Sequence, residues 1–220
     1  MPVDFADTNL APHWLALTGA PPFADAVTPQ TALFAECLAP KQITTPEYAF
    51  VVNYGYHLDA GKFAELLRRH CTEKLGVKHV RANVSQINAA ENGDIRSVTT
   101  DRAGEIEGDL FIDCTGTRSL LLGEHFGVPF QSQQACLFND TALAAQVPYA
   151  DENQPIQSCT HSTAQTSGWI WDIGLVTRRG TGYVYSSAHI DHDAAEVELR
   201  DYLRGSIGTQ ADTVGIRRIP

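Results

Sequence analysis

The sequence predicts an α/β protein in which a helix and a group of strands precede an antiparallel β region. Three observations support this prediction. An amphipathic segment at residues 60–75 is followed at once by the strand-like run VKHVRANVSQI. An apolar run at residues 110–114 then stops at Thr115-Gly116. Further along, GWIWDIGL and GYVYSSAHI alternate in side-chain character, which is typical of half-buried antiparallel strands.

Composition limits the class of protein and the class of partner. The 220 residues are 43% apolar and 19% charged, enough for one large domain or two small ones with a real core. A formal charge of -10 argues against nucleic acid or an anionic membrane surface as the partner and favours small molecules. No apolar run approaches the roughly 18 residues of a membrane span, and the N-terminus does not resemble a secretion signal. We therefore expect a soluble, cytoplasmic protein.

The thiol and imidazole side chains predict neither disulfides nor a metal site. The cysteines are odd in number, widely spread and without a CxxC pair, so free thiols are expected. The eight histidines form no ligand cluster, since His189 and His192 stand three residues apart without further Cys or His partners nearby. The cysteines concerned are Cys37, Cys71, Cys114, Cys136 and Cys159.

The first part of the chain, residues 1–53, holds most of the prolines and little periodicity. Its one helical signal is TPQTALFAECLA, where Thr28 can cap a short helix that has Pro29 at its first position. We expect an irregular segment that runs over another part of the protein.

Regular structure is expected to begin in YHLDAGKFAELLRRHCTEKLG. Asp59 can cap the helix, Phe63 and Leu67 share one face with Cys71, and Gly76 provides the stop. Strands are then expected in VKHVRANVSQI, IRSVTT and EIEGD, separated by turns at ENGD and Ala103-Gly104. The apolar strands Val77 to Val84 and Leu110 to Cys114 are expected to lie in one sheet, with the helix packed on it.

The end of the second apolar run is a candidate ligand site. In an open α/β sheet, ligands bind at the carboxyl ends of strands, and a glycine there lets the backbone approach a phosphate or sugar. Asp113 and Gly116 occupy these positions in DCTG, ahead of a short expected helix. The alternative is that Asp113 closes a turn or caps that helix, which aspartate commonly does.

The segment GWIWDIGL contains two of the three tryptophans in the chain. In an extended strand, Trp169, Trp171 and Ile173 point to one side, and Ile170 and Asp172 point to the other. Two interpretations follow: a half-buried strand that covers a core, or a wall of indoles that faces a planar ligand. A last helix is expected in DAAEVELRDYL, where the residue types at 193 and 196 fit a capping box.

Taken in order, YHLDAGKFAELLR, GVKHV, GDLFIDCTGTRSLLL, QVPYA, GWIWDIGL and GTGYVYSSAHI resemble the middle of the flavin-dependent tryptophan halogenases. The resemblance extends over residues 54–203 and, more loosely, 28–53. It implies a partial FAD-binding, Rossmann-like domain of the aromatic hydroxylase type with an antiparallel β region that covers the substrate. The implied division is an irregular segment over the substrate side (1–53), part of the FAD-binding domain (54–125), and a β-rich region with the WxW strand and the terminal helix (126–220).

The resemblance also implies a reaction. Reduced FAD, supplied by a separate flavin reductase, reacts with oxygen, and the resulting oxidant converts halide into the species that halogenates tryptophan or another electron-rich aromatic. The family signature GWxWxIP lies close to the flavin, and Trp169 and Trp171 match its two tryptophans. A rigid, dry apolar wall there would protect the oxidant from water.

Flavin contacts are implied at four positions. Val84 matches a position whose backbone meets the adenine in related flavoproteins, although a strand core valine is an equal alternative. Asp113, Thr115 and Gly116 match the segment near the cofactor that follows a strand.

The sequence also departs from the family pattern. It contains no GxGxxG turn, and neither the catalytic lysine nor the catalytic glutamate of the family has a match, because Lys41 falls after the lysine position in order. We therefore assign no catalytic residue and expect the chain alone to bind FAD weakly and to be inactive. Gly174 stands where the signature has proline, which puts the rigidity of the wall in doubt. The alternatives are an FAD-dependent aromatic monooxygenase and a catalytically dead remnant or truncated frame.

Overall fold

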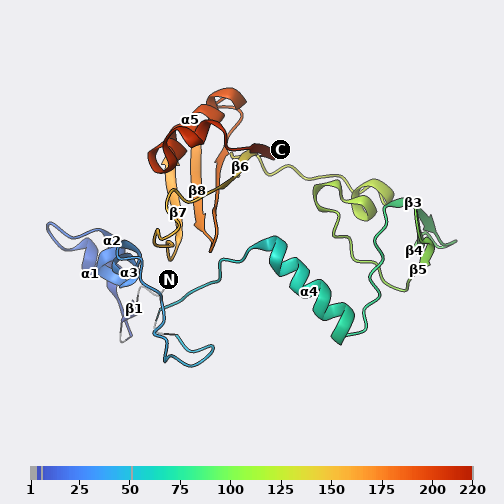
Figure 1. Ribbon diagram of the computed structural model, residues 1–220, viewed down its shortest axis with the longest axis horizontal. Helices are drawn as coiled ribbons and strands as arrows, with labels where there is room; N and C mark the ends of the chain where they lie inside the picture. The colour runs from blue at the N-terminus through green and yellow to red at the C-terminus, as the bar shows by residue number, and fades with distance from the viewer. Residues whose placement is uncertain (1–3, 6, 51, 220) are drawn as a thin grey trace. The chain divides into compact units, whose positions relative to one another are not determined.

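The computed structural model describes residues 4–5, 7–50 and 52–219, and Figure 1 labels its helices and strands. The chain forms two compact units, one made of the residues up to Asp59 together with those from Cys136 onward, the other of Ala60–Ala135. The N-terminal residues thus belong to the same unit as the C-terminal β region. The functional division into 1–53, 54–125 and 126–220 stays a prediction.

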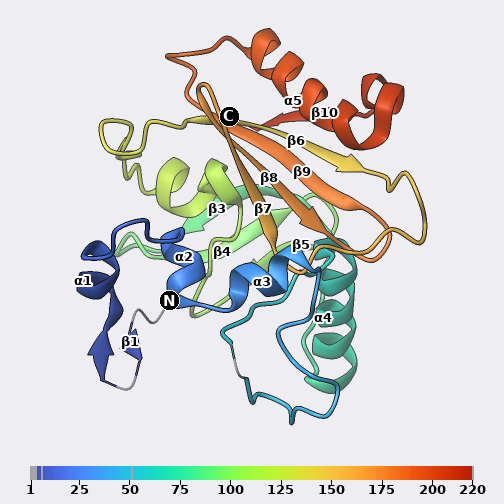
Figure 2. The same ribbon diagram turned by 90° about the vertical axis from the view of Figure 1, so that its left-hand side faces the viewer.

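The first unit is built on a five-stranded sheet with the order β10-β6-β9-β8-β7, in which every neighbouring pair is antiparallel. The antiparallel β region is therefore confirmed, and Figure 2 shows its strands together with helix α5. The strands are β6 (Thr141–Val147), β7 (Thr160–Gln165), β8 (Gly168–Gly174), β9 (Arg179–Tyr185) and β10 (Ile216–Ile219).

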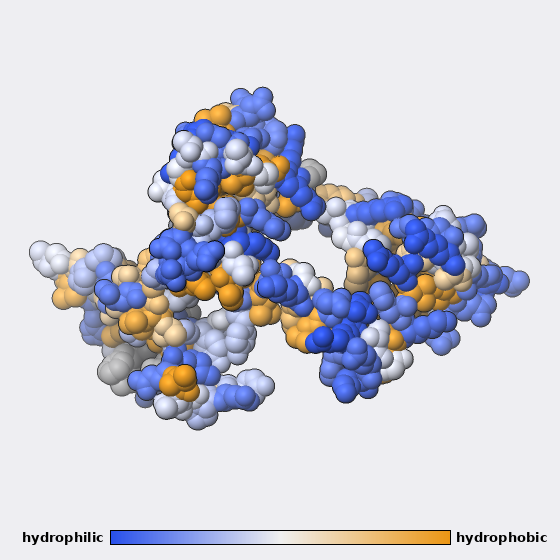
Figure 3. Space-filling view, in the orientation of Figure 1, coloured by the Kyte–Doolittle hydropathy of each residue, from blue (hydrophilic) through white to orange (hydrophobic). Residues whose placement is uncertain are grey.

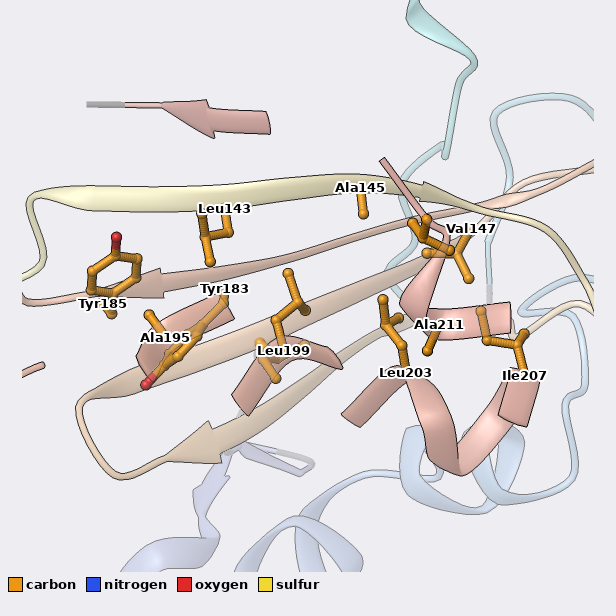
Figure 4. Close-up of a cluster of buried hydrophobic side chains, with 12 residues drawn as sticks. Leu143, Ala145, Val147, Tyr183, Tyr185, Ala195, Leu199, Leu203, Ile207 and Ala211 are labelled. Carbon is orange, nitrogen blue, oxygen red and sulfur yellow. The ribbon is translucent and has the colours of Figure 1, made fainter. Parts of the chain in front are cut away.

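Helix α5 (His192–Ile207), followed by the 3-10 helix η3 (Gly208–Asp212), covers one face of this sheet. Its buried residues recur every four positions and so form one stripe. Figure 4 shows this stripe packed on inward-pointing residues of β6 and β9. The stripe consists of Ala195, Leu199, Leu203 and Ile207, and it meets Leu143, Ala145, Val147, Ile170, Tyr183 and Tyr185.

Two details of this core follow from local chemistry. The carboxylate of Asp191 accepts a hydrogen bond from the Ala194 N–H at 2.8 Å, so the helix cap is Asp191 and the predicted cap at Asp193 is wrong. Both residues are aspartates, and the backbone becomes helical one residue after the first. Tyr183 donates from its hydroxyl to Glu198 at 2.7 Å, and burial together with that carboxylate raises the pKa of Tyr183 to about 12.

The N-terminal part of the first unit is made of short elements. The Thr28 hydroxyl accepts a hydrogen bond from the Gln30 N–H at 3.2 Å, as expected of a cap, and the helix begins at Gln30 rather than at Pro29. Between this helix and Asp59, the described residues form no helix or strand. The elements are β1 (Asp4–Phe5), β2 (Thr8–Asn9), α1 (Leu10–Leu15), α2 (Phe23–Val27) and α3 (Gln30–Ala35).

The second unit begins with helix α4 (Ala60–Lys74), at the predicted position. Gly76 has a φ of 69°, and the Val77 N–H returns to the Cys71 carbonyl at 3.0 Å, which is the expected stop. An antiparallel meander of three strands follows in the order β3-β4-β5. Its strands are β3 (Val84–Ala89), β4 (Ile95–Thr100) and β5 (Gly104–Glu107), close to the predicted runs.

The prediction that Val77 to Val84 and Leu110 to Cys114 form strands of one sheet under the helix is wrong. Only Val84 of these residues lies in a strand, and α4 buries none of its residues. An apolar run becomes a buried strand only when neighbouring strands accept and donate its backbone hydrogen bonds, and the described residues provide no such neighbour. Leu110 and Ile112 are accordingly 81% and 80% exposed. Figure 3 shows that hydrophobic side chains reach the surface of both units.

Among the described residues, none of the helices has the length and apolar character that crossing a bilayer requires. All five cysteines are free, as expected.

Candidate functional site

Strand β8 presents two different faces. Ile170 is fully buried and Asp172 is 6% exposed, whereas Trp169 is 38% exposed and Trp171 and Ile173 are half-buried. The alternation predicted for GWIWDIGL is thus confirmed. The inner face, with Ile170, meets the core under α5, and the outer face carries the indoles. The two tryptophans are therefore not part of the main hydrophobic core.

The indole pair, Trp169 and Trp171, is arranged edge to face. The ring centroids lie 6.3 Å apart with an angle of 62° between the planes. β8 is paired on both sides, with β7 and with β9, so the backbone that carries the pair is held by two ladders. A half-exposed indole fixed against a second indole provides a rigid, flat apolar surface for a planar ring.

On the inner face, Asp172 is the centre of a buried polar cluster. Its Oδ2 atom accepts hydrogen bonds from Arg179 Nη1 at 2.6 Å and from the Tyr202 hydroxyl at 3.2 Å. Its Oδ1 atom accepts one from the Thr181 hydroxyl at 3.2 Å. Arg179 also donates from Nη2 to Ser206 at 2.6 Å, which ties β9 to α5. The charge is paired and its oxygens are satisfied, so the cluster joins the sheet to the helix.

The sequence predicted Asp172 on the face opposite the tryptophans, but it predicted neither the burial of that face nor a partner for the carboxylate. The available signal was an acid at an inward position of a strand, because a carboxylate there requires a cation or several donors. Arg179 pairs across the sheet with Gly174, two residues along β8 from Asp172. That relation depends on strand register, which cannot be read from the local pattern.

A cavity of about 950 Å³ lies in the first unit. It is lined by residues of the N-terminal segment between Ala24 and His57 and by residues between Ile156 and Val176. The ring of Phe34 lies 4.7 Å from that of His161, and the Thr160 hydroxyl lies 3.2 Å from His57 Nε2. Aromatic and imidazole rings therefore meet in its walls.

The cavity wall contains two buried polar atoms without a partner in the described part of the chain and a tyrosine hydroxyl with a lowered pKa. Gln157 Oε1 and His161 Nε2 are buried without a hydrogen-bond partner among the described residues. A hydrogen bond from Tyr56 and the nearby Lys41 ammonium lower the pKa of the Tyr54 hydroxyl. Lys41 donates to Tyr54 at 3.4 Å and to the Pro46 carbonyl at 3.1 Å. Trp169 and Trp171 do not line this cavity, so the structure does not bring the indole pair into it.

The predicted strand-end site lies in the second unit, where the short helices η1 (Gly116–Arg118) and η2 (Leu120–His125) follow Asp113. Asp113 Oδ1 accepts hydrogen bonds from the N–H and the hydroxyl of Thr115 at 3.0 and 2.6 Å. Its Oδ2 accepts one from the Leu121 N–H at 2.8 Å. These bonds support the alternative that Asp113 closes the turn and caps the following helix.

The other predicted cofactor residues are only partly brought together. Thr115 and Gly116 lie beside Asp113, and Gly116 has a φ of 68° with open space where a side chain would stand. Val84 lies on a different element, at the start of β3 opposite Thr100, and is half-buried. Contact of these residues with a cofactor stays a prediction.

We expect the Asp113 carboxyl to titrate far below an ordinary aspartate. The hydrogen bonds from Thr115 and Leu121 favour the charged form and lower its pKa to about 2. Since the folded pKa is depressed, its contribution to stability is present above the unfolded pKa of about 3.9 and is lost as the pH falls through about 2. Carboxyl chemical shifts measured by NMR against pH check this. Thr115→Val removes one donor and should raise the midpoint, whereas an ordinary midpoint in the unmodified chain would contradict the cap.

Comparisons with known proteins identify the same family as the tryptophan signature in β8. The family model described as tryptophan halogenase matches residues 3–218. The tryptophan 7-halogenase RebH of Lentzea aerocolonigenes is 43% identical over 149 residues, which are 68% of this chain and 28% of that protein.

Two solved structures are similar over nearly the whole chain. The tryptophan halogenase of Shewanella frigidimarina is 56% identical with a TM-score of 0.84, over 96% of this chain and 39% of its own. BrvH, a flavin-dependent halogenase from Brevundimonas, is 33% identical with a TM-score of 0.81, over 99% of this chain and 44% of its own. This chain therefore spans less than half the length of each of these relatives.

Proposed function

This chain belongs to the tryptophan halogenase family, and from that premise we propose that it acts in the flavin-dependent halogenation of tryptophan or another electron-rich aromatic compound. The proposal includes reduced FAD as cofactor, a separate flavin reductase as transient partner, and halide with a small aromatic molecule as substrates. The observation on which it depends is the indole pair on the outer face of β8, in the segment GWIWDIG.

The residues present fit part of what such a cofactor needs. Bound reduced FAD supplies the activation of oxygen. The outer face of β8 offers a planar ring a flat apolar neighbour, since Trp169 is half-exposed and is braced edge to face by Trp171. In the second unit, the left-handed backbone at Gly116 leaves open space beside the turn that Asp113 organises. We propose Val84, Asp113, Thr115 and Gly116 as residues near the cofactor.

The role proposed for Trp169 and Trp171 is to exclude water and to keep the organic substrate apart from the flavin. This role is supported by the apolar character of the two indoles and by the two strand ladders that hold their backbone in place. Gly174, where the family signature has proline, is buried in β8 and paired with Arg179. The strand ladder therefore restrains this position even without a proline ring, which supports a rigid wall.

We further propose a cytoplasmic location. The reaction needs a reductase and reduced nicotinamide, and the five free cysteines fit a reducing compartment.

A chimeric halogenase tests the proposed function. Residues 3–218 of this chain replace the matching segment of the Shewanella frigidimarina tryptophan halogenase, whose structure is similar over 96% of this chain. Given FAD, a flavin reductase, NADH, oxygen and chloride or bromide, the chimera is expected to yield halogenated tryptophan, identified by its isotope pattern in mass spectrometry. A folded chimera that binds FAD but forms no halogenated product from tryptophan or indole would contradict the proposal.

In the same chimera, Trp169→Ala and Trp171→Ala should leave the fold and FAD binding intact. They are expected to raise the hydrogen peroxide released per NADH consumed, because opening the wall admits water. The matched control is Val176→Ala, which removes an exposed apolar side chain beyond the end of the same strand. If both tryptophan variants release the same amount of hydrogen peroxide per NADH as the unmodified chimera, the proposed role of Trp169 and Trp171 is wrong.

A further inference from the structure

We propose that Gly182 on β9 is the residue that positions Trp171, by leaving the space that the indole occupies. The proposal rests on the proposed function in one respect only, namely that the orientation of Trp171 matters for the reaction. Trp171 and Gly182 are direct cross-strand partners, and residues directly opposite each other in an antiparallel pair share a face. The glycine therefore lies beneath the indole on the outer face of the sheet.

The packing around Gly182 leaves no room for a side chain. A Cβ atom at this position would overlap the Cζ2 and Cη2 atoms of the Trp171 indole and the carbonyl oxygen of Leu143 on β6. Gly182 is itself buried although it has no side chain, which is consistent with the indole lying over it. The six-membered ring of Trp171 thus lies across β9 toward β6.

Backbone conformation does not explain this glycine. Gly182 is not among the residues with positive φ, so its backbone does not lie in the left-handed region that favours glycine. A glycine also weakens a strand interior, because it is entropically costly and offers nothing to pack. The remaining reason for glycine at this position is close approach, here by an indole and by the neighbouring strand.

Gly180, two residues earlier in the same strand, provides the contrast. It lies on the same face, opposite Ile173, and it too lacks a positive φ. A Cβ atom there would meet no described atom within 4 Å. The two glycines thus share strand and face, and neither has a positive φ; only Gly182 lies beneath the indole and beside the Leu143 carbonyl, and the double-mutant comparison below separates these two contacts.

The neighbours of Gly182 on β6 extend the same small-residue surface. Ala144 is its direct partner and Ala142 lies opposite Val184, both on the outer face. An indole over glycine and alanine can lie flat, whereas larger residues would lift it from the sheet. The position of Trp171 over Gly182 in turn determines the edge-to-face contact between Trp171 and Trp169. Gly182 therefore acts on the wall through Trp171 and is a positioning residue.

The test uses this chain with Trp14→Phe, which leaves the indole pair as the only tryptophans. In that background, Gly182→Ala is compared with Gly180→Ala. Circular dichroism reports the exciton coupling of the two indoles, and acrylamide quenching reports their accessibility. We expect Gly182→Ala to abolish the couplet and to increase quenching, and Gly180→Ala to change neither. A Gly182→Ala chain that keeps both signals would overturn the proposal.

A double-mutant comparison keeps the test decisive if Gly182→Ala is poorly folded. Gly182→Ala should lower the urea midpoint of unfolding less in a Trp171→Ala background than in the parent chain. In that background the overlap with the indole is gone and only the overlap with the Leu143 carbonyl remains. An equal loss in both backgrounds would overturn the proposal. Neither measurement needs flavin or halide, so an inactive chimera contradicts the proposed function and leaves the role of Gly182 standing.

Discussion

Replacing Asp172 by alanine is expected to lower the free energy of unfolding by about 3–5 kcal/mol, because it leaves the Arg179 guanidinium buried without its counter-ion. The side chains of Asp172 and Arg179 are 8% and 11% exposed, so water cannot readily replace the lost bonds. Tyr202 and Thr181 lose the acceptor of their hydroxyl groups in the same step. Urea denaturation followed by circular dichroism measures the change.

The matched control is Asp201→Ala, which removes an aspartate from the surface of α5. Asp201 pairs with Arg204, but its side chain is 63% exposed, and exposed ion pairs contribute at most about 1 kcal/mol. Comparable losses in the two variants would mean that the buried cluster does not hold the sheet to the helix. A large loss for Asp172 alone identifies it as a structural residue on the inner face of the signature strand.

Ile170→Ala, one residue from Trp169, is expected to lower the free energy of unfolding by about 2–5 kcal/mol. Ile170 is fully buried between the sheet and α5, and its truncation leaves a cavity that the core cannot readily fill. Trp169→Ala should cost clearly less although it removes a larger side chain, since Trp169 is 38% exposed and lies outside that core. Both values come from the same urea experiment on this chain.

The comparison separates the two interpretations of GWIWDIGL. If Trp169→Ala costs as much as Ile170→Ala, the indole acts as a core residue and the physical basis of the wall disappears. A small loss of stability for Trp169→Ala together with a large loss for Ile170→Ala means that only the inner face of β8 contributes strongly to the stability of the fold. The other face is then free for a role that packing does not explain.

Much of the fold could be predicted because the signals are local. The four-residue spacing of α4 and the alternation in β8 and β9 lie within single segments, and the stop at Gly76 is a property of one residue. The run at residues 110–114 failed because strand formation is a relation between segments. Its apolar character predicts burial, but burial requires partner strands, and these cannot be deduced from the run itself.

In the candidate site, too, local features could be predicted and relations between segments could not. The two faces of β8 followed from alternation, so the separation of the tryptophans from Ile170 and Asp172 was predictable, but which of the two faces is buried was not. Gly182 and Arg179 were not, because their relation to β8 depends on the register of β9. The turn-capping role of Asp113 was foreseen only as an alternative, since aspartate near a glycine suits both a turn and a ligand site.

The order of strands in the sheet has a consequence for how this unit acquires its structure. β7, β8 and β9 are consecutive in sequence and adjacent in the sheet, joined by turns at residues 166–167 and 175–178. β6 and β10 reach the sheet across longer connections, residues 148–159 before β7 and residues 186–215, with α5 and η3, after β9. Closing a longer connection costs more conformational entropy. Contacts close in sequence form early in folding, so the meander that carries both tryptophans is expected to assemble before β6 docks beside β9. The indole of Trp171 would then be in place over Gly182 when β6 arrives, and would serve as part of the template on which the rest of the sheet is completed.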